Sequence, residues 1–185
     1  MQIKLTEMYE MLSALHKSIR RGLEQEAGHW FFMIAEGGYY SAAANRLRIC
    51  SHEDIGLADP GVVVFVKNAM DQADHWHKSK NDAWRLPVSN CILALCRARK
   101  SREADHFNFV MRGRIIKGPK KEVPDWAYDK HTQKGRKMGR GWDHFKKEGM
   151  KLDPPYHDRY EDECFEYLEE GVFDKKKTEE LPFKE

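Results

Sequence analysis

Apolar residues recur at helical spacing in the first part of the chain. One stripe has members at i, i+3, i+4, i+7 and i+11, namely Met8, Met11, Leu12, Leu15 and Ile19. This spacing predicts an amphipathic helix that Gly22 ends. A glycine-bounded run over residues 22–38 is continuously apolar at residues 30–34, which predicts a second helix buried on most sides. The alanine-containing residues 39–50 predict a third helix.

The stretch SHEDIGLADPG, residues 51–61, separates these patterns from the next one. Gly56 can adopt the left-handed conformation that ends a helix. Asp59 is a favoured N-cap, and Pro60 suits the first helical position because its missing N–H would have no partner there. The stretch therefore predicts a loop between two helices. Its adjacent acids, Glu53 and Asp54, would face different directions on a helix, which favours capping or salt bridges over a shared acid–base role.

Helical spacing continues after this loop. The apolar positions are Val62, Phe65, Val66, Ala69, Met70, Ala73 and Trp76. The valine run alone is compatible with a buried strand, but the periodicity favours a helix. Residues 88–99 predict a short apolar helix, Ser101 marks the start of another, and an acidic helix is expected from His157 to Glu170. The predicted fold class is all-α, a compact helical domain.

Charge is segregated in the C-terminal part of the chain. After Gly118 the composition changes to one rich in Pro, Gly, Lys and Arg. Residues 112–151 hold thirteen Lys or Arg against five Asp or Glu, a net +8, whereas residues 152–185 hold five against twelve, a net −7. This asymmetry indicates either a nucleic-acid face beside an acidic tail or two segments that neutralise each other. We expect a helical core at 1–118, a basic, loop-rich extension of the same domain at 119–152, and an acidic helix and tail at 153–185.

Composition narrows the class of protein. The 185 residues fit one domain, and no apolar run approaches the roughly 20 residues that span a bilayer. The N-terminal segment has no export signal, so we expect a cytoplasmic protein. The cysteines form no C-x-x-C pair and are expected to be reduced core thiols: Cys50, Cys91, Cys96 and Cys164. We predict neither a metal nor a cofactor.

The sequence lacks the common motifs of hydrolytic enzymes. No G-x-x-x-x-G-K-[ST] is present, and the run from Gly135 to Gly141 has neither the spacing nor a preceding strand. G-x-S-x-G and H-E-x-x-H are also absent from the sequence. We therefore expect this chain to have no catalytic activity of its own.

Residues 129–149, DKHTQKGRKMGRGWDHFKKEG, combine cations and glycines with aromatic residues. Lys and Arg neutralise phosphates, glycines let backbone N–H groups approach closely, and aromatic rings stack on unpaired bases. The candidate nucleic-acid-binding residues are Lys130, Lys134, Arg136, Lys137, Arg140 and Trp142. A solvated surface or a docking segment explains the same composition. His131, Asp143 and His144 suggest one further alternative, the metal site of a nuclease.

Four blocks of the sequence resemble one known family. EDIGLADP, residues 53–60, is similar to a motif in the C-terminal region of the RarA/MgsA family of replication-associated AAA+ ATPases, whose eukaryotic relative is the Werner-helicase-interacting protein. LHKSIRRG resembles the family's F-x-K-S-I-R-G, and RLPVSNCILALCRARKS resembles its R-I-P-L-A-x-A-V-I-Y-L-A-x-A-P-K-S. The HTQKGRKMG region is similar to a later basic, glycine-containing stretch. Within the first block, the residues of the family motif are Glu53, Asp54, Gly56, Leu57, Asp59 and Pro60.

The resemblance implies an all-helical domain related to the collar of clamp loaders. In this family that domain assembles the ATPase into a ring-like homotetramer, which acts at stalled forks and single-stranded gaps. The resemblance covers the collar region without the ATPase half, so we expect either a free-standing homologue or a fragment. It also implies that residues 53–60 tie two collar helices together, with their acids bonded to backbone amides or to arginines such as Arg46 and Arg48.

Three functions remain open at this point. The first is a non-catalytic oligomerisation and interaction module in DNA replication or repair. Its apolar helix faces would form the subunit interface of a homo-oligomer, residues 112–151 would contact DNA or a partner protein, and the partner would be an AAA+ ATPase or a replication protein. The second is a stand-alone protein that binds single-stranded or forked DNA through the six candidate residues. The third is a small metal-dependent nuclease that uses His131 and His144.

Overall fold

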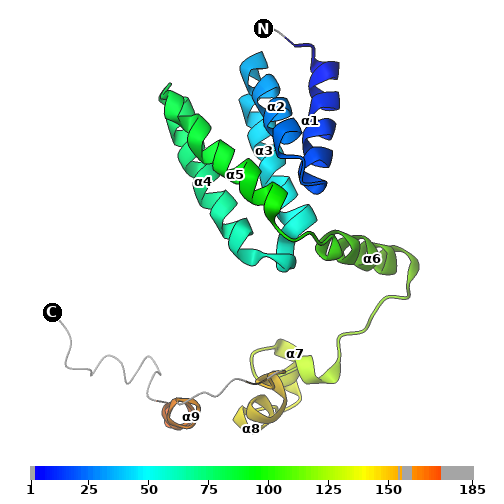
Figure 1. Ribbon diagram of the computed structural model, residues 1–185. Coiled ribbons are helices and arrows are strands. Elements are labelled where there is room, and N and C mark those ends of the chain that lie inside the picture. The colour runs from blue at the N-terminus through cyan, green and yellow to red at the C-terminus, as the bar shows by residue number, and fades with distance from the viewer. Residues whose placement is uncertain (1–2, 154, 156–159, 172–185) are drawn as a thin grey trace, which may run out of the picture. The chain divides into compact units, whose positions relative to one another are not determined.

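All the regular structure in the described part of the chain is helical. The computed structural model describes residues 3–153, 155 and 160–171, and no strand occurs among them (Figure 1). The all-α prediction is therefore confirmed. The chain divides into two compact units, residues 1–119 and 120–185. The expected three-part division of the chain stays a prediction.

The first unit is built from six α-helices. They are α1 (Leu5–Arg20), α2 (Glu24–Ile34), α3 (Tyr40–Cys50), α4 (Pro60–Lys78), α5 (Arg85–Arg97) and α6 (Glu103–Lys117). Helices α1 to α5 pack together around one apolar core, and α6 extends beyond the end of α5 (Figure 1). A kinked turn, Ala35–Tyr39, in which Gly38 has a φ of +94°, joins α2 to α3. A π-helical turn, Ser51–Ile55, and a 3-10 turn, Gly56–Ala58, join α3 to α4.

The predicted stripe on α1 is confirmed as the face that packs on the core. Met8, Leu12, Leu15 and Ile19 are buried, and Met11 packs against them as a partly buried residue. Gly22 ends this region with a φ of +71°. A Cβ at that position would lie 3.2 Å from the carbonyl oxygen of Cys96, so glycine is favoured by space as well as by conformation.

The predicted start of α4 is confirmed in detail. Gly56 has a φ of +48°, and Asp59 Oδ1 accepts a hydrogen bond from the Val62 N–H at 3.3 Å. Pro60 is the first helical residue, as expected from its missing N–H. The buried residues of α4 are Val66, Met70 and Ala73. Because these residues are spaced by four and three, the valine-rich segment is a helix with one buried face rather than a buried strand.

The helix boundaries that differ from the expected ones include the starts of α5 and α6. Helix α5 begins at Arg85 rather than residue 88, because the 3-10 turn Asp82–Trp84 leads directly into it. Asn81 caps that turn by accepting from the Ala83 N–H at 2.9 Å. Helix α6 begins at Glu103, and the Ser101 hydroxyl accepts from its N–H at 3.2 Å. Ser101 therefore acts as a capping residue just outside the helix.

The second unit has short helices around a small aromatic cluster. Its elements are the 3-10 turn Asp125–Ala127, α7 (Gln133–Lys137), α8 (Trp142–His144), the π-helical turn Phe145–Gly149 and α9 (Glu161–Glu169). The Trp142 ring packs edge-on against Phe145 and Phe165, with centroids 5.9 and 6.1 Å apart. Lys146 forms an ion pair with Glu169, which joins the basic segment to the acidic helix. The predicted start of that helix, His157, lies outside the described residues.

The cysteines are free thiols, as expected, but they do not all lie in the core. Cys50, Cys91 and Cys96 are buried, whereas Cys164 is exposed on α9. The core assignment of Cys164 is therefore wrong, because α9 buries only a narrow face around Phe165. Burial raises the pKa of Cys91 to about 12 and that of Cys96 to about 11.

Among the described residues, no helix has the length and apolar character that crossing a membrane requires.

Candidate functional site

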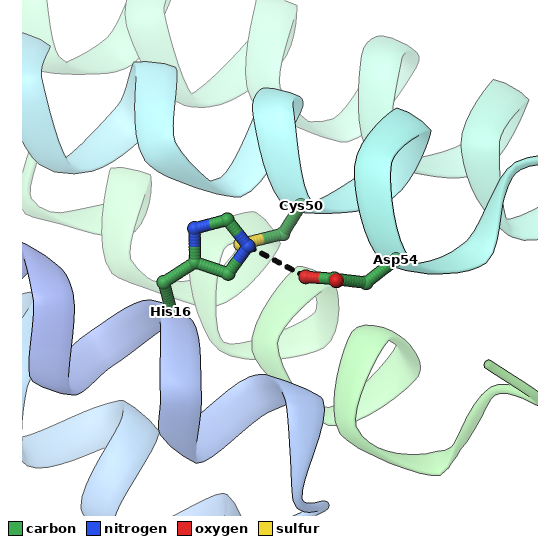
Figure 2. A group of neighbouring side chains, drawn as sticks. All are labelled: His16, Cys50 and Asp54. Atoms are coloured by element: carbon green, nitrogen blue, oxygen red, sulfur yellow. Dashed lines mark hydrogen bonds and ion pairs between the residues drawn. The ribbon is translucent and has the colours of Figure 1, made fainter. Parts of the chain in front are cut away.

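A completely buried carboxylate organises the first unit. Asp54 lies in the π-helical turn Ser51–Ile55 and has no exposed surface. Its Oδ2 lies 2.5 Å from His16 Nε2, and its Oδ1 accepts from Arg20 Nε at 2.7 Å. His16 and Arg20 are four residues apart on α1 and therefore share a face of that helix. Figure 2 shows the His16 ring on α1 directed at the Asp54 carboxylate, with the Cys50 side chain beside them.

The proton of His16 is assigned by its neighbours. Arg46 Nη1 lies 3.3 Å from His16 Nδ1, and a guanidinium can only donate. Arg20 Nη2 also lies 3.1 Å from Nε2, but the Asp54 carboxylate lies closer to Nε2, at 2.5 Å, and can only accept. Nε2 therefore carries the proton and donates to Asp54, and Nδ1 is left as the acceptor for Arg46. The ring thus bridges an arginine of α3 and the acid of the turn, which fixes its orientation.

Glu53 is held by two further ion pairs beside the buried acid. Its Oε1 accepts from Arg20 Nη2 at 2.9 Å and lies 3.3 Å from Arg102 Nη2. The expected salt-bridge role of the two acids is therefore confirmed. The expectation that arginines bind these acids is also confirmed, but the two arginines named as examples are not the partners. Arg48 pairs with Asp74 of α4 at 2.7 Å, and Arg46 lies beside His16.

The cluster brings together three of the sequence blocks that were singled out. LHKSIRRG supplies His16 and Arg20, and EDIGLADP supplies Glu53 and Asp54. RLPVSNCILALCRARKS ends at Ser101, whose N–H donates to the Asp54 backbone carbonyl at 2.8 Å. His16 and Arg20 were not predicted to be the partners of these acids. The sequence did contain a signal for this role, since both are polar residues beside the apolar stripe of α1.

The charge of Asp54 is stabilised despite its burial. Burial by itself raises the pKa of a carboxyl group, but the hydrogen bonds and positive charges of His16 and Arg20 outweigh it, so the pKa of Asp54 is lowered. The ligand atoms of His16, Cys50 and Asp54 lie within 4.8 Å of one another, which is close enough to consider a metal ion. They fit a metal poorly, because burial raises the pKa of the Cys50 thiol and keeps it protonated. Arg20 and Arg46 also contact the same groups and would repel a cation.

Helix α6 presents a second candidate surface. None of its residues is buried, although it contacts the turns Ser51–Ile55 and Gly56–Ala58. We define the α6 apolar surface by its five large exposed apolar residues, Phe107, Phe109, Val110, Ile115 and Ile116. At 100° per residue, Phe107, Val110 and Ile115 fall on one side of the helix, and Phe109 and Ile116 fall on the other. The helix is therefore apolar on two opposite sides.

The candidate nucleic-acid-binding residues lie in the second unit, in three different settings. Lys134, Arg136 and Lys137 are exposed on α7. Lys130 Nζ lies 2.8 Å from the centroid of the Trp142 ring and covers one of its faces. Sequence reasoning did not predict this pairing of two candidate residues.

Arg140 has the strongest internal contacts of the candidate residues. Its guanidinium donates to both carboxylate oxygens of Asp125 at 2.7 Å, and to the backbone carbonyls of Asp125 and Tyr128 at 2.7 Å. It therefore holds the loop before α7. Gly135 completes this packing, since a Cβ there would overlap the backbone of Asp129.

The residues of the nuclease alternative lie in the second unit. The His131 ring packs edge-on against Phe145, with centroids 4.9 Å apart. Within the described residues, the three side chains that gather as potential metal ligands are His16, Cys50 and Asp54 of the first unit. Asp143 and His144 are not gathered with His131 in this way, and the nuclease alternative stays a prediction.

The fold and the site of the first unit define the class of protein: a small all-α domain that a buried ion-pair cluster stabilises. Comparison with known proteins gives the family. The family model for the MgsA AAA+ ATPase C terminal matches residues 24–177, so the chain belongs to that family. The resemblance inferred from EDIGLADP is thereby confirmed.

Individual relatives agree with this assignment. The chain is 32% identical over 136 residues to Replication-associated recombination protein A of Bacillus subtilis, across 74% of this chain and 32% of that protein. It is 29% identical over 133 residues to ATPase WRNIP1 of Dictyostelium discoideum, across 65% of this chain and 15% of that protein. The Haemophilus influenzae Replication-associated recombination protein A is 38% identical over 64 residues, across 34% of this chain and 14% of that protein. The chain thus spans about a third or less of the length of these relatives.

Proposed function

We propose that this chain is a non-catalytic oligomerisation and interaction module that acts in DNA replication or recombination-repair. Two findings support a role in these processes. The family is the C-terminal part of an AAA+ ATPase, and two of the relatives are named for replication-associated recombination. Its partners would be further copies of the chain, as a homotetramer in the family pattern, and an AAA+ ATPase or a replication protein.

The α6 apolar surface carries the proposal. A helix that is apolar on opposite sides normally lies buried, and an isolated helix of 15 residues is marginally stable in water. Burying a large apolar side chain contributes about 1.5–3 kcal/mol, so five of them supply on the order of 10 kcal/mol before the costs of association. A protein partner that covers both sides of α6 would recover this free energy.

Light scattering over a concentration series tests the assembly. We expect the wild-type chain to form a stable oligomer, well above the 21.7 kDa of one copy. Phe107→Glu places a charge on the α6 apolar surface and should shift the mass towards one copy. Leu86→Glu is the matched control, because Leu86 is 66% exposed on α5 and Phe107 is 64% exposed. A wild-type chain that stays monomeric at every concentration would rule out the homo-oligomer. Equal losses of mass in both variants would rule out the α6 apolar surface as its specific interface.

The exposed cations of α7 favour a second candidate function, the binding of single-stranded or forked DNA. Lys134, Arg136 and Lys137 crowd one short helix, and each phosphate that they neutralise on a single strand adds about 0.7 to the slope of log affinity against log salt. Fluorescence anisotropy with a single-stranded oligonucleotide tests this. Reversing these three charges should weaken binding and flatten the slope, and unchanged affinity would rule this function out. Arg140 is left intact, because its loss would also break the contacts to Asp125.

A further inference from the structure

A cleft opens beside the buried cluster of the first unit. It has a volume of about 310 Å³ and is lined by residues of α1, by Arg46 of α3 and by Glu53 of the turn. Three of the lining side chains are permanent cations: Lys17 and Arg20 of α1, and Arg46 of α3. One acid, Glu53, faces them.

The acid of this cleft is already neutralised. Glu53 pairs with Arg20 at 2.9 Å and with Arg102 at 3.3 Å, and Arg20 also pairs with the buried Asp54. Among the residues that the structure describes, no carboxylate lies within 4.0 Å of the charged nitrogens of Lys17 or Arg46. Within the described part of the chain, these two cations therefore have no carboxylate counter-ion at this distance.

Arg46 is the more informative of the two, because it is half-buried. Arg46 Nη1 donates to His16 Nδ1 at 3.3 Å. This hydrogen bond uses one of the five N–H groups of the guanidinium and does not neutralise its positive charge. A partly buried cation without an anionic partner carries an uncompensated desolvation cost. An anion in the cleft would remove that cost.

The chemistry of the walls selects the kind of anion. The planar fork of an arginine and the point charge of a lysine together suit the tetrahedral oxygens of a phosphate. Ser13 and Tyr9 line the same cleft and add hydroxyl groups. The cleft has room for one phosphate group with its waters, since about ten water molecules would fill 310 Å³.

We infer that the cleft between Lys17 and Arg46 binds a phosphate group. The phosphate could belong to a small molecule, such as free phosphate or a nucleotide, or to the backbone of a nucleic acid. The inference does not rest on the proposed assembly role, which uses α6, nor on the cations of α7.

Thermal unfolding with inorganic phosphate tests the site. The unfolding midpoint of the full chain should rise with phosphate concentration, and it should not rise with chloride or acetate at equal ionic strength. Arg46→Gln keeps an amide donor for His16 but loses the charge, and should weaken phosphate binding at least fivefold. Lys17→Gln provides a second variant at an exposed position, where folding is not at risk. Lys67→Gln is the control, since it removes one exposed positive charge on α4.

Fluorescence anisotropy with a ten-nucleotide single strand then identifies the source of the phosphate. If the ligand is a nucleic-acid backbone, Arg46→Gln should weaken binding and lower the salt slope by about 0.7, even when the three α7 charges are reversed. If only inorganic phosphate responds to Arg46→Gln, the ligand is a small phosphate compound. Three results would each overturn the inference: no phosphate-dependent rise in the midpoint, an equal rise with acetate, or an equal loss in Lys67→Gln.

Discussion

Replacing Asp54 by Asn tests whether the buried cluster stabilises the fold. The substitution preserves the shape of the side chain but removes its charge and one of its two acceptor oxygens. In the wild type these oxygens serve His16 Nε2 and Arg20 Nε. In the variant, one of those donors faces the new amide group, which cannot accept.

The cost follows from the burial of the groups involved. A hydrogen bond to a charged group contributes about 1.5–3 kcal/mol, and breaking a buried ion pair costs about 3–5 kcal/mol. Asp54 has no exposed surface, but the Arg20 side chain is 31% exposed and keeps its bond to Glu53. We therefore expect a loss near the lower end, about 3 kcal/mol.

Urea unfolding followed by circular dichroism measures this loss, because α1 to α6 contain most of the helical residues. With a slope of about 2 kcal/mol per molar urea, the midpoint should fall by about 1.5 M. Asp71→Asn is the matched control, since Asp71 is exposed and pairs with Lys67 on the surface of α4; its midpoint should hardly move. If both variants move the midpoint equally, the reasoning about the buried cluster is refuted.

Three further predictions concern acid stability, thiol reactivity and packing. The pKa of folded Asp54 is lowered from its ordinary 3.8, so its contribution to folding stability is complete above that pH and is lost as the pH falls through the folded pKa. In Asp54→Asn, stability should therefore fall less steeply with decreasing pH in the acid range than it does in the wild type. An identical fall in both proteins would contradict this. In native protein, Ellman's reagent should titrate Cys164 rapidly and the three buried thiols only after unfolding, so rapid reaction of more than one thiol would show that the core opens. Gly135→Ala should destabilise the second unit by at least about 2 kcal/mol, measured by thermal unfolding followed by tryptophan fluorescence, whereas Gly141→Ala has open space and should not.

Local sequence patterns predicted the helices and their order along the chain. The stripe from Met8 to Ile19 became the buried face of α1, and Asp59-Pro60 became the start of α4. Such signals act through neighbouring turns of the same helix, so a single sequence contains them. Errors arose where a boundary depended on the adjoining segment, as at Arg85, which a 3-10 turn precedes.

The sequence also identified the family through EDIGLADP and indicated that its acids have a structural role. It did not identify their partners. Backbone amides or arginines such as Arg46 and Arg48 were expected to bind the acids, but Arg48 pairs with Asp74 and Arg46 lies beside His16. The six candidate nucleic-acid-binding residues looked equivalent in the sequence, yet Arg140 is held by Asp125 while Lys134 is exposed.

The sequence by itself therefore determined the helices, the loop before α4 and the family, because periodicity, capping residues and motifs are local properties of the chain. Only the tertiary structure decided which charges meet. Asp54 lies 34 residues from Arg20 and 38 from His16 along the chain, and their contact depends on how α1 packs against the turn after α3. It likewise decided that α6 remains uncovered, because burial depends on the neighbours that a helix finds in space and not on its own sequence.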